Sequence, residues 1–109
     1  MQRKVYRTTL KPERRQEYIE AHQNVSTDLM RRYREAGMHL CAVYMLGDEL
    51  VLMVDAEDIK QTSAILAEDP VDRVWQAFVG PMKVDGDWQE MKELFYADLK
   101  YSELSCSRD

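Results

Sequence analysis

The residues best suited to chemistry in this chain are a histidine and a tyrosine that precedes it by four positions. His22 is one of only two histidines, with His39 as the other. It follows Tyr18 in a segment of helical periodicity, so the two side chains are expected to share one helix face. Histidine can transfer protons near neutral pH, and a neighbouring hydroxyl is typical of an acid–base pair. A packed histidine bonded to a backbone carbonyl is the structural alternative, and the residues alone leave both open.

A second candidate group lies in the apolar segment 38–46. Side chains alternate between the faces of a strand, which predicts that His39, Cys41 and Val43 share one face. That face could line a pocket, or these side chains could simply contribute to the core.

A third candidate is the segment Asp72-Arg73-Val74-Trp75. Its tryptophan could stack on a sugar ring or fill the core, because an indole combines a large apolar face with a polar edge. A glycine-rich phosphate loop, a nucleophile elbow and a His/Cys cluster with metal-ligand spacing are all missing from the sequence. No metal site is therefore expected.

Composition narrows the class of protein. The net charge of −5 and the absence of a basic patch argue against nucleic-acid binding. No apolar run approaches the roughly 18 residues that a membrane span needs, and residues 1–6 lack the apolar centre of a signal peptide. Cys41 and Cys106 have no motif spacing, so neither a disulfide framework nor a zinc site is expected. We predict a reduced, cytoplasmic protein.

Hydrophobic periodicity predicts four strands and two helical segments. Alternation and β-forming residues place strands at residues 3–10, 38–46, 50–56 and 94–97, with a tight hairpin turn at 47–49. The helical segments cover residues 12–36 and 57–82, with a restart at Asp69-Pro70 and a loop at 84–88.

The first helical segment carries one apolar stripe and is expected to break near residue 25. Polar residues that cap helices well but fit poorly inside them cluster at Asn24, Ser26, Thr27 and Asp28. Gly37 is a good C-terminal stop. The members of the stripe, at spacings of three and four, are Tyr18, His22, Val25, Leu29, Tyr33 and Ala36.

The resulting order, β-α-β-β-α-β, predicts an α+β protein of the ferredoxin-like class with an antiparallel sheet. Residues 1–98 form a single domain in this interpretation, and residues 99–109 form a polar tail. Helices cover one face of such a sheet. Because residues 50–54 are apolar on both faces, we predict a homodimer in which the two sheets face each other or their edges join into a barrel.

The chain resembles the L-rhamnose mutarotases, small sugar-epimerising enzymes of the dimeric α/β-barrel class. The resemblance extends over nearly all of residues 3–97. It is carried by Arg3-Lys4, Glu17-Tyr18 followed by His22, Gly37-x-His39 before Ala42-x-Tyr44, Asp69 with Arg73-x-Trp75, and Gln89-Glu90 with Phe95-Tyr96.

This resemblance implies roles for individual residues. His22 matches the family's proton donor, while Tyr18 and Trp75 match sugar-binding positions. Cys41 falls where the family has a substrate-binding tyrosine, and Val74 falls on the first member of a tryptophan pair. The site residues implied are therefore His22 as the catalytic group, with Tyr18, Trp75, Cys41 and Val74 as substrate-binding positions.

The reaction implied is the interconversion of the α and β anomers of a deoxyhexose, L-rhamnose or a related aldose such as L-fucose. It needs an acid–base group and a few hydrogen bonds, with no cofactor or metal. Two alternatives stay open. One is a cofactor-free monooxygenase or isomerase acting on a small apolar molecule, and the other is a dimeric ligand-binding protein in which His22 is structural.

Overall fold

The computed structural model describes residues 1–84 and 88–100, and its centre is a four-stranded antiparallel sheet. The strand order is β2-β3-β1-β4, in which the first and third strands of the chain are neighbours. This order confirms the predicted ferredoxin-like class. The strands are β1 (Gln2–Thr9), β2 (Met38–Leu46), β3 (Glu49–Ala56) and β4 (Gln89–Met91).

The fourth strand lies earlier in the chain than the sequence predicts. β4 pairs with β1 through residues 89–91, whereas the predicted strand at 94–97 is outside the sheet. The pairing is held by polar contacts that an apolar pattern does not signal. Lys4 Nζ lies 3.1 Å from Glu90 Oε1, and Arg7 donates a 2.6 Å hydrogen bond to Gln89. The apolar residues that suggested a strand, Leu94 and Phe95, are instead almost fully exposed.

The first helical segment is divided in two, as the cluster of capping residues predicts. A short 3₁₀ turn (η1, Pro12–Arg14) leads into α1 (Arg15–Gln23), and α2 (Thr27–Glu35) follows after a break. The Ser26 hydroxyl accepts a 3.1 Å hydrogen bond from the Leu29 N–H, which satisfies a free donor of the first turn of α2.

The second helical segment is also divided. Its parts are α3 (Ile59–Ala67), α4 (Pro70–Val79) and a 3₁₀ turn (η2, Gly80–Met82). Asp69 caps α4 by accepting hydrogen bonds from the backbone N–H groups of Val71 and Asp72. The expected restart at Asp69-Pro70 is therefore confirmed.

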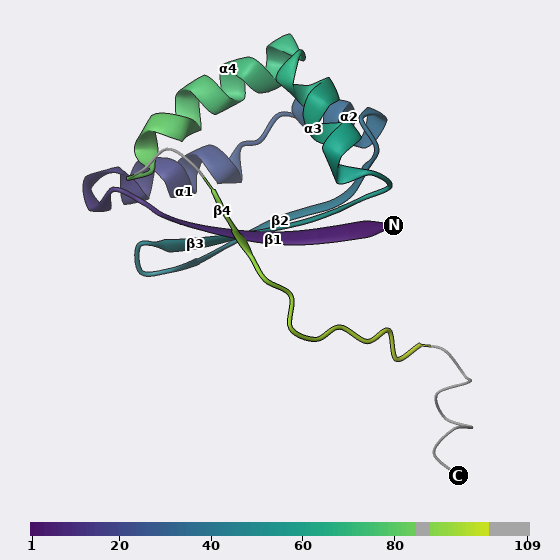
Figure 1. The fold of residues 1–109 in the computed structure, drawn as a ribbon. Coiled ribbons are helices and arrows are strands. Elements are labelled where there is room, and N and C mark those ends of the chain that lie inside the picture. The colour runs from purple at the N-terminus through teal and green to yellow at the C-terminus, as the bar shows by residue number, and fades with distance from the viewer. Residues whose placement is uncertain (85–87, 101–109) are drawn as a thin grey trace.

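All four α-helices lie on one face of the sheet, and residues 92–100 leave the sheet on its other side (Figure 1). Along this segment the Tyr96 ring lies 4.1 Å from the guanidinium of Arg3 on β1. The main core cluster comprises Leu10, Tyr18, Leu50, Val79 and Met82. The other face of the sheet has no helical cover among the described residues.

The predicted tail from residue 101 onward, and positions 85–87 of the predicted loop, lie outside the described residues. Within the described part of the chain, no helix has the length and apolarity of a membrane span.

Candidate functional site

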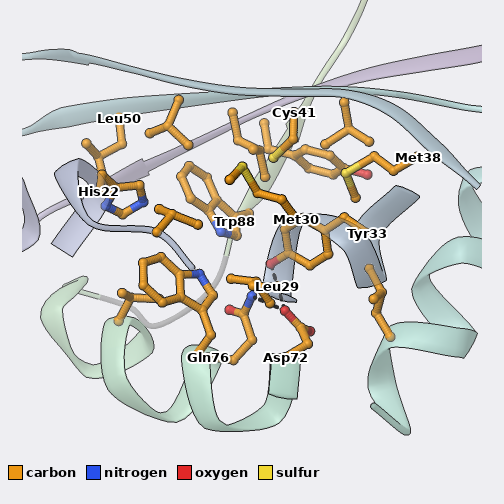
Figure 2. Close-up of a pocket in the computed structure, with 18 of the residues that line it drawn as sticks. His22, Leu29, Met30, Tyr33, Met38, Cys41, Leu50, Asp72, Gln76 and Trp88 are labelled. Atoms are coloured by element: carbon orange, nitrogen blue, oxygen red, sulfur yellow. Dashed lines mark hydrogen bonds between the residues drawn. The ribbon is translucent and has the colours of Figure 1, made fainter. Parts of the chain in front are cut away.

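An open cavity of about 1000 Å³ lies between the helical layer and the sheet. The stripe predicted for the first helical segment faces into it from α1, the break and α2, apart from Ala36. Strands β2 and β3 form the opposite wall, and α4 closes a third side (Figure 2). The cavity is therefore bounded by elements from the whole chain, which is typical of a small-molecule site.

His22 is fixed in orientation by its own helix. Its Nδ1 lies 2.9 Å from the backbone oxygen of Tyr18. A carbonyl oxygen only accepts, so Nδ1 carries the hydrogen in this contact and Nε2 is the nitrogen left to act on a ligand. The imidazole also lies 4.2 Å from the Tyr18 ring and 5.2 Å from the Trp75 ring, measured between centroids. The carbonyl bond expected of a packed histidine is therefore present. It orients an imidazole that also lines the cavity, as an acid–base group would.

Tyr18 is buried, yet its hydroxyl has no hydrogen-bond partner within the described residues. Removal from water raises the pKa of Tyr18 to about 12, and the nearby Cys41 thiol contributes a smaller rise. The phenol therefore stays a neutral hydrogen-bond donor and acceptor throughout the physiological pH range.

The high pKa of Tyr18 predicts a loss of stability in alkali. Between about pH 10, the pKa of an unfolded tyrosine, and pH 12, the unfolded chain has lost a proton that the folded chain retains. The free energy of unfolding must then fall as pH rises, by roughly 2–3 kcal/mol from this group at most. We expect the free energy of unfolding of Tyr18→Phe to decrease less steeply with pH than that of the wild type. Urea denaturation at pH 9 to 11, with pH 7 as the baseline, measures it. The same decrease with pH in both proteins would contradict the prediction.

Cys41 lines the cavity from β2 and Trp75 from α4, as the sequence predicts for a shared site. Although the Cys41 side chain is accessible from the open cavity, surrounding protein atoms desolvate it and raise the pKa of its thiol. The neighbouring Asp72 carboxylate raises this pKa further. Cys41 thus presents a neutral thiol to the cavity, which is a weak hydrogen-bond donor.

His39 does not share the cavity with Cys41. A β-bulge between Met38 and Leu40 leaves His39 as the extra residue, and its Nε2 lies 2.9 Å from Glu57 outside the cavity. The bulge shifts the alternation by one, so Met38 and Cys41 both line the cavity although they are three positions apart. The predicted common face of His39, Cys41 and Val43 is therefore wrong for His39 alone.

Val74 lies outside the cavity and is 71 % exposed. The cavity face of α4 is set by positions 72, 75, 76 and 79, at spacings of three and four, and residue 74 falls on the other side of the helix. The structure therefore does not bring Val74 together with His22, Tyr18, Cys41 and Trp75 in this cavity, and its role as a substrate-binding position stays a prediction.

Three polar lining residues were given no role at a site in the sequence analysis, although Tyr33 belongs to the predicted stripe and Asp72 to the third candidate segment. Tyr33 on α2 donates a 2.7 Å hydrogen bond to Asp72 Oδ1, and Gln76 on α4 donates a second one of 3.3 Å to the same oxygen (Figure 2). Their helical spacing is visible in the sequence, but it becomes meaningful only once α2 and α4 are known to face each other. Among the described residues no group of three metal-ligating side chains occurs.

Solved structures with similar folds belong to several small enzymes. The crystal structure of an L-rhamnose mutarotase from Formosa agariphila is 16 % identical, with a TM-score of 0.73, and covers 90 % of this chain and 100 % of its own. A putative antibiotic biosynthesis monooxygenase from Bordetella bronchiseptica is 15 % identical, with a TM-score of 0.66 and coverages of 85 % and 96 %. Tetracenomycin F2 cyclase from Streptomyces glaucescens is 16 % identical, with a TM-score of 0.61 and coverages of 93 % and 100 %. At these identities the likeness shows a shared fold.

Sequence comparison assigns a family, which the shared fold does not. No curated protein shows significant sequence similarity to the chain. The family model for L-rhamnose mutarotase, however, matches residues 3–97, nearly the full length. The match spans α1 with His22, β2 with Cys41 and α4 with Trp75, the elements that surround the cavity. The chain therefore belongs to the L-rhamnose mutarotase family, whose members are isomerases that act on carbohydrates.

Proposed function

We propose that this protein interconverts the anomers of L-rhamnose, or of a related aldose such as L-fucose, by proton transfer at His22. The observation that carries the proposal is the fixed imidazole, whose Nδ1 is bonded to a carbonyl and whose Nε2 is left for a ligand in a cavity beside Tyr18 and Trp75. A positioned acid–base group typically accelerates such proton transfers by about 10²–10⁴-fold.

The chemistry follows from these groups. Protonated His22 donates the Nε2 proton to the ring oxygen of the sugar, while the anomeric hydroxyl gives up its proton and the ring bond breaks. The neutral Tyr18 hydroxyl takes up that proton as it passes its own to water in the open cavity, and the reverse relay returns a proton to the anomeric oxygen on reclosure. Rotation about the first carbon–carbon bond and reclosure form the other anomer and return the proton to His22. Trp75 offers an apolar face to the ring.

The proposal is tested by NMR exchange between anomers, with L-rhamnose, L-fucose and other aldoses as a panel. We expect wild-type protein to accelerate exchange of at least one deoxyhexose. Exchange at the uncatalysed rate for every aldose would reject the function. Binding of an aromatic or polyketide-like ligand, with no response to sugars, would instead favour the apolar-ligand alternative.

We also propose that the protein acts as a homodimer in the cytoplasm, with the helix-free faces of two sheets in contact. That face carries exposed apolar side chains, among them Tyr44, Leu46 and Met91. Its arginines are already paired within the protomer, Arg3 with Asp55 at 2.9 Å and Arg7 with Glu49. An apolar surface with internally paired charges can be covered by a second copy without leaving an isolated ion.

A further inference from the structure

The cavity has a second polar end, which the acid–base chemistry does not use. It consists of Tyr33, Asp72 and Gln76, and we call it the Asp72 cluster. In Figure 2 the cluster lies across the cavity from His22, with Met30 and other apolar side chains between them. Of the described residues that line the cavity, Asp72 is the sole carboxylate.

The hydrogen bonds of Asp72 are unevenly divided between its two oxygens. Oδ1 accepts from both Tyr33 and Gln76, whereas Oδ2 has no hydrogen-bond partner in the part of the chain that the structure describes. The Asp72 residue is only 7 % exposed. Oδ2 keeps some accessible surface although the residue as a whole is buried, so it is the oxygen of Asp72 that is left to accept a hydrogen bond from a ligand in the cavity. The hydrogen bond from Tyr33 to Oδ1 links α2 to α4, which gives that oxygen a structural role. This link does not involve Oδ2.

The Asp72 cluster is continuous with the catalytic end of the cavity. Asp72 and Gln76 lie on α4 one turn from each other and on the same face as Trp75, which contacts His22. One helical turn rises about 5.4 Å, so a single helix can contact two sides of one sugar ring. Asp72 also raises the pKa of the Cys41 thiol, and Cys41 raises that of Tyr18, because these groups from α4, β2 and α1 lie near one another in the cavity.

We propose that Asp72, held by Tyr33 and assisted by Gln76, binds the sugar hydroxyls on the side of the ring opposite the anomeric centre. This inference rests on the proposed function and adds a specificity-determining residue to it. When the anomeric carbon and ring oxygen lie at His22, the ring edge that points away carries the hydroxyls on carbons 3 and 4. Oδ2 accepts from one of these hydroxyls, and the Gln76 amide is placed to bond its neighbour.

The test compares Asp72→Asn with wild-type protein on L-rhamnose and on its 3-deoxy and 4-deoxy analogues, by anomer exchange. For the wild type we expect kcat/KM for at least one analogue to be roughly 10–100-fold below that for L-rhamnose, since a hydrogen bond to a charged group is lost. In the variant, L-rhamnose should fall by a similar factor, mainly through a higher KM, and the preference over the analogue should disappear.

A matched control separates this role from the link between helices. Arg32 joins α2 to α4 through a 3.0 Å ion pair with Asp69, and both residues lie outside the cavity. Arg32→Gln should therefore leave the sugar preference and KM unchanged. If Asp72→Asn does not fold, by near-ultraviolet circular dichroism, Gln76→Leu at an exposed position is the substitute, with an expected loss of preference of roughly 3–10-fold.

The outcomes are distinguishable. A folded Asp72→Asn protein that keeps the wild-type preference overturns this inference and leaves the proposed function standing. The same holds if Gln76→Leu, used as the substitute, changes nothing. Wild-type protein that neither accelerates exchange nor binds L-rhamnose in calorimetry overturns both.

Discussion

His22→Ala is expected to abolish catalysed anomer exchange, with a loss of about 10²–10⁴-fold, while the protein remains folded. The histidine is half-buried at the cavity wall and lies outside the main core cluster, so its removal leaves that cluster intact. The measurement is NMR exchange on L-rhamnose, alongside circular dichroism to confirm the fold.

His22→Gln distinguishes this mechanism from a purely structural histidine. A glutamine can still bond polar neighbours, but it cannot exchange a proton near neutral pH. The mechanism predicts that His22→Gln is as inactive as His22→Ala, with a nearly unchanged melting temperature. A structural role predicts the reverse, which is a lower melting temperature with full activity.

Tyr44→Asp is expected to convert a dimer into monomers. Tyr44 is 59 % exposed on the edge strand β2, where it pairs with Val51. It alternates with Val43 and Met45, which face the cavity, so its side chain belongs to the helix-free face although the residue also borders the cavity. A carboxylate placed there would be buried without a partner against the second sheet. Loss of an aromatic contact adds to this cost, so we expect dimer affinity to fall by roughly 100-fold or more. Sedimentation velocity at micromolar concentration measures it.

The control for this prediction is Ile65→Asp. Ile65 is 45 % exposed on α3, in the helical layer, and does not line the cavity. It therefore introduces the same charge on the opposite side of the sheet and should leave the dimer intact. A wild-type protein that sediments as a monomer, or dissociation by both variants alike, would contradict the proposed interface.

The helix boundaries could be predicted from the sequence, because each depends on residues within a few positions of it. The cap at Ser26 and the restart at Asp69-Pro70 depend on backbone groups a few positions away, so sequence order is enough to find them. β4 was misplaced because its pairing with β1 depends on Lys4 and Arg7, which are distant in the sequence.

The candidate site was predictable to a similar extent. Tyr18, His22 and Trp75 were found because helical spacing and family resemblance agree on them. The resemblance also pointed to Val74, which the rotation of α4 places outside the cavity. Asp72 lies in a candidate segment but was given no role, since an isolated acidic residue on a helix carries no signal until Tyr33 is seen to donate to it from another helix.

The bulge at His39 has a consequence for any comparison between this chain and its relatives. A looped-out residue changes which strand positions correspond in space, so an alignment without a gap is in phase with the fold on only one side of it. The correspondence of Cys41 with a ligand-binding tyrosine is spatially valid for relatives that carry the same extra residue, or for an alignment that is in phase on the Cys41 side of the bulge. In a relative with a regular strand that is aligned in phase on the other side, the equivalent alignment column would point to the sheet's outer surface.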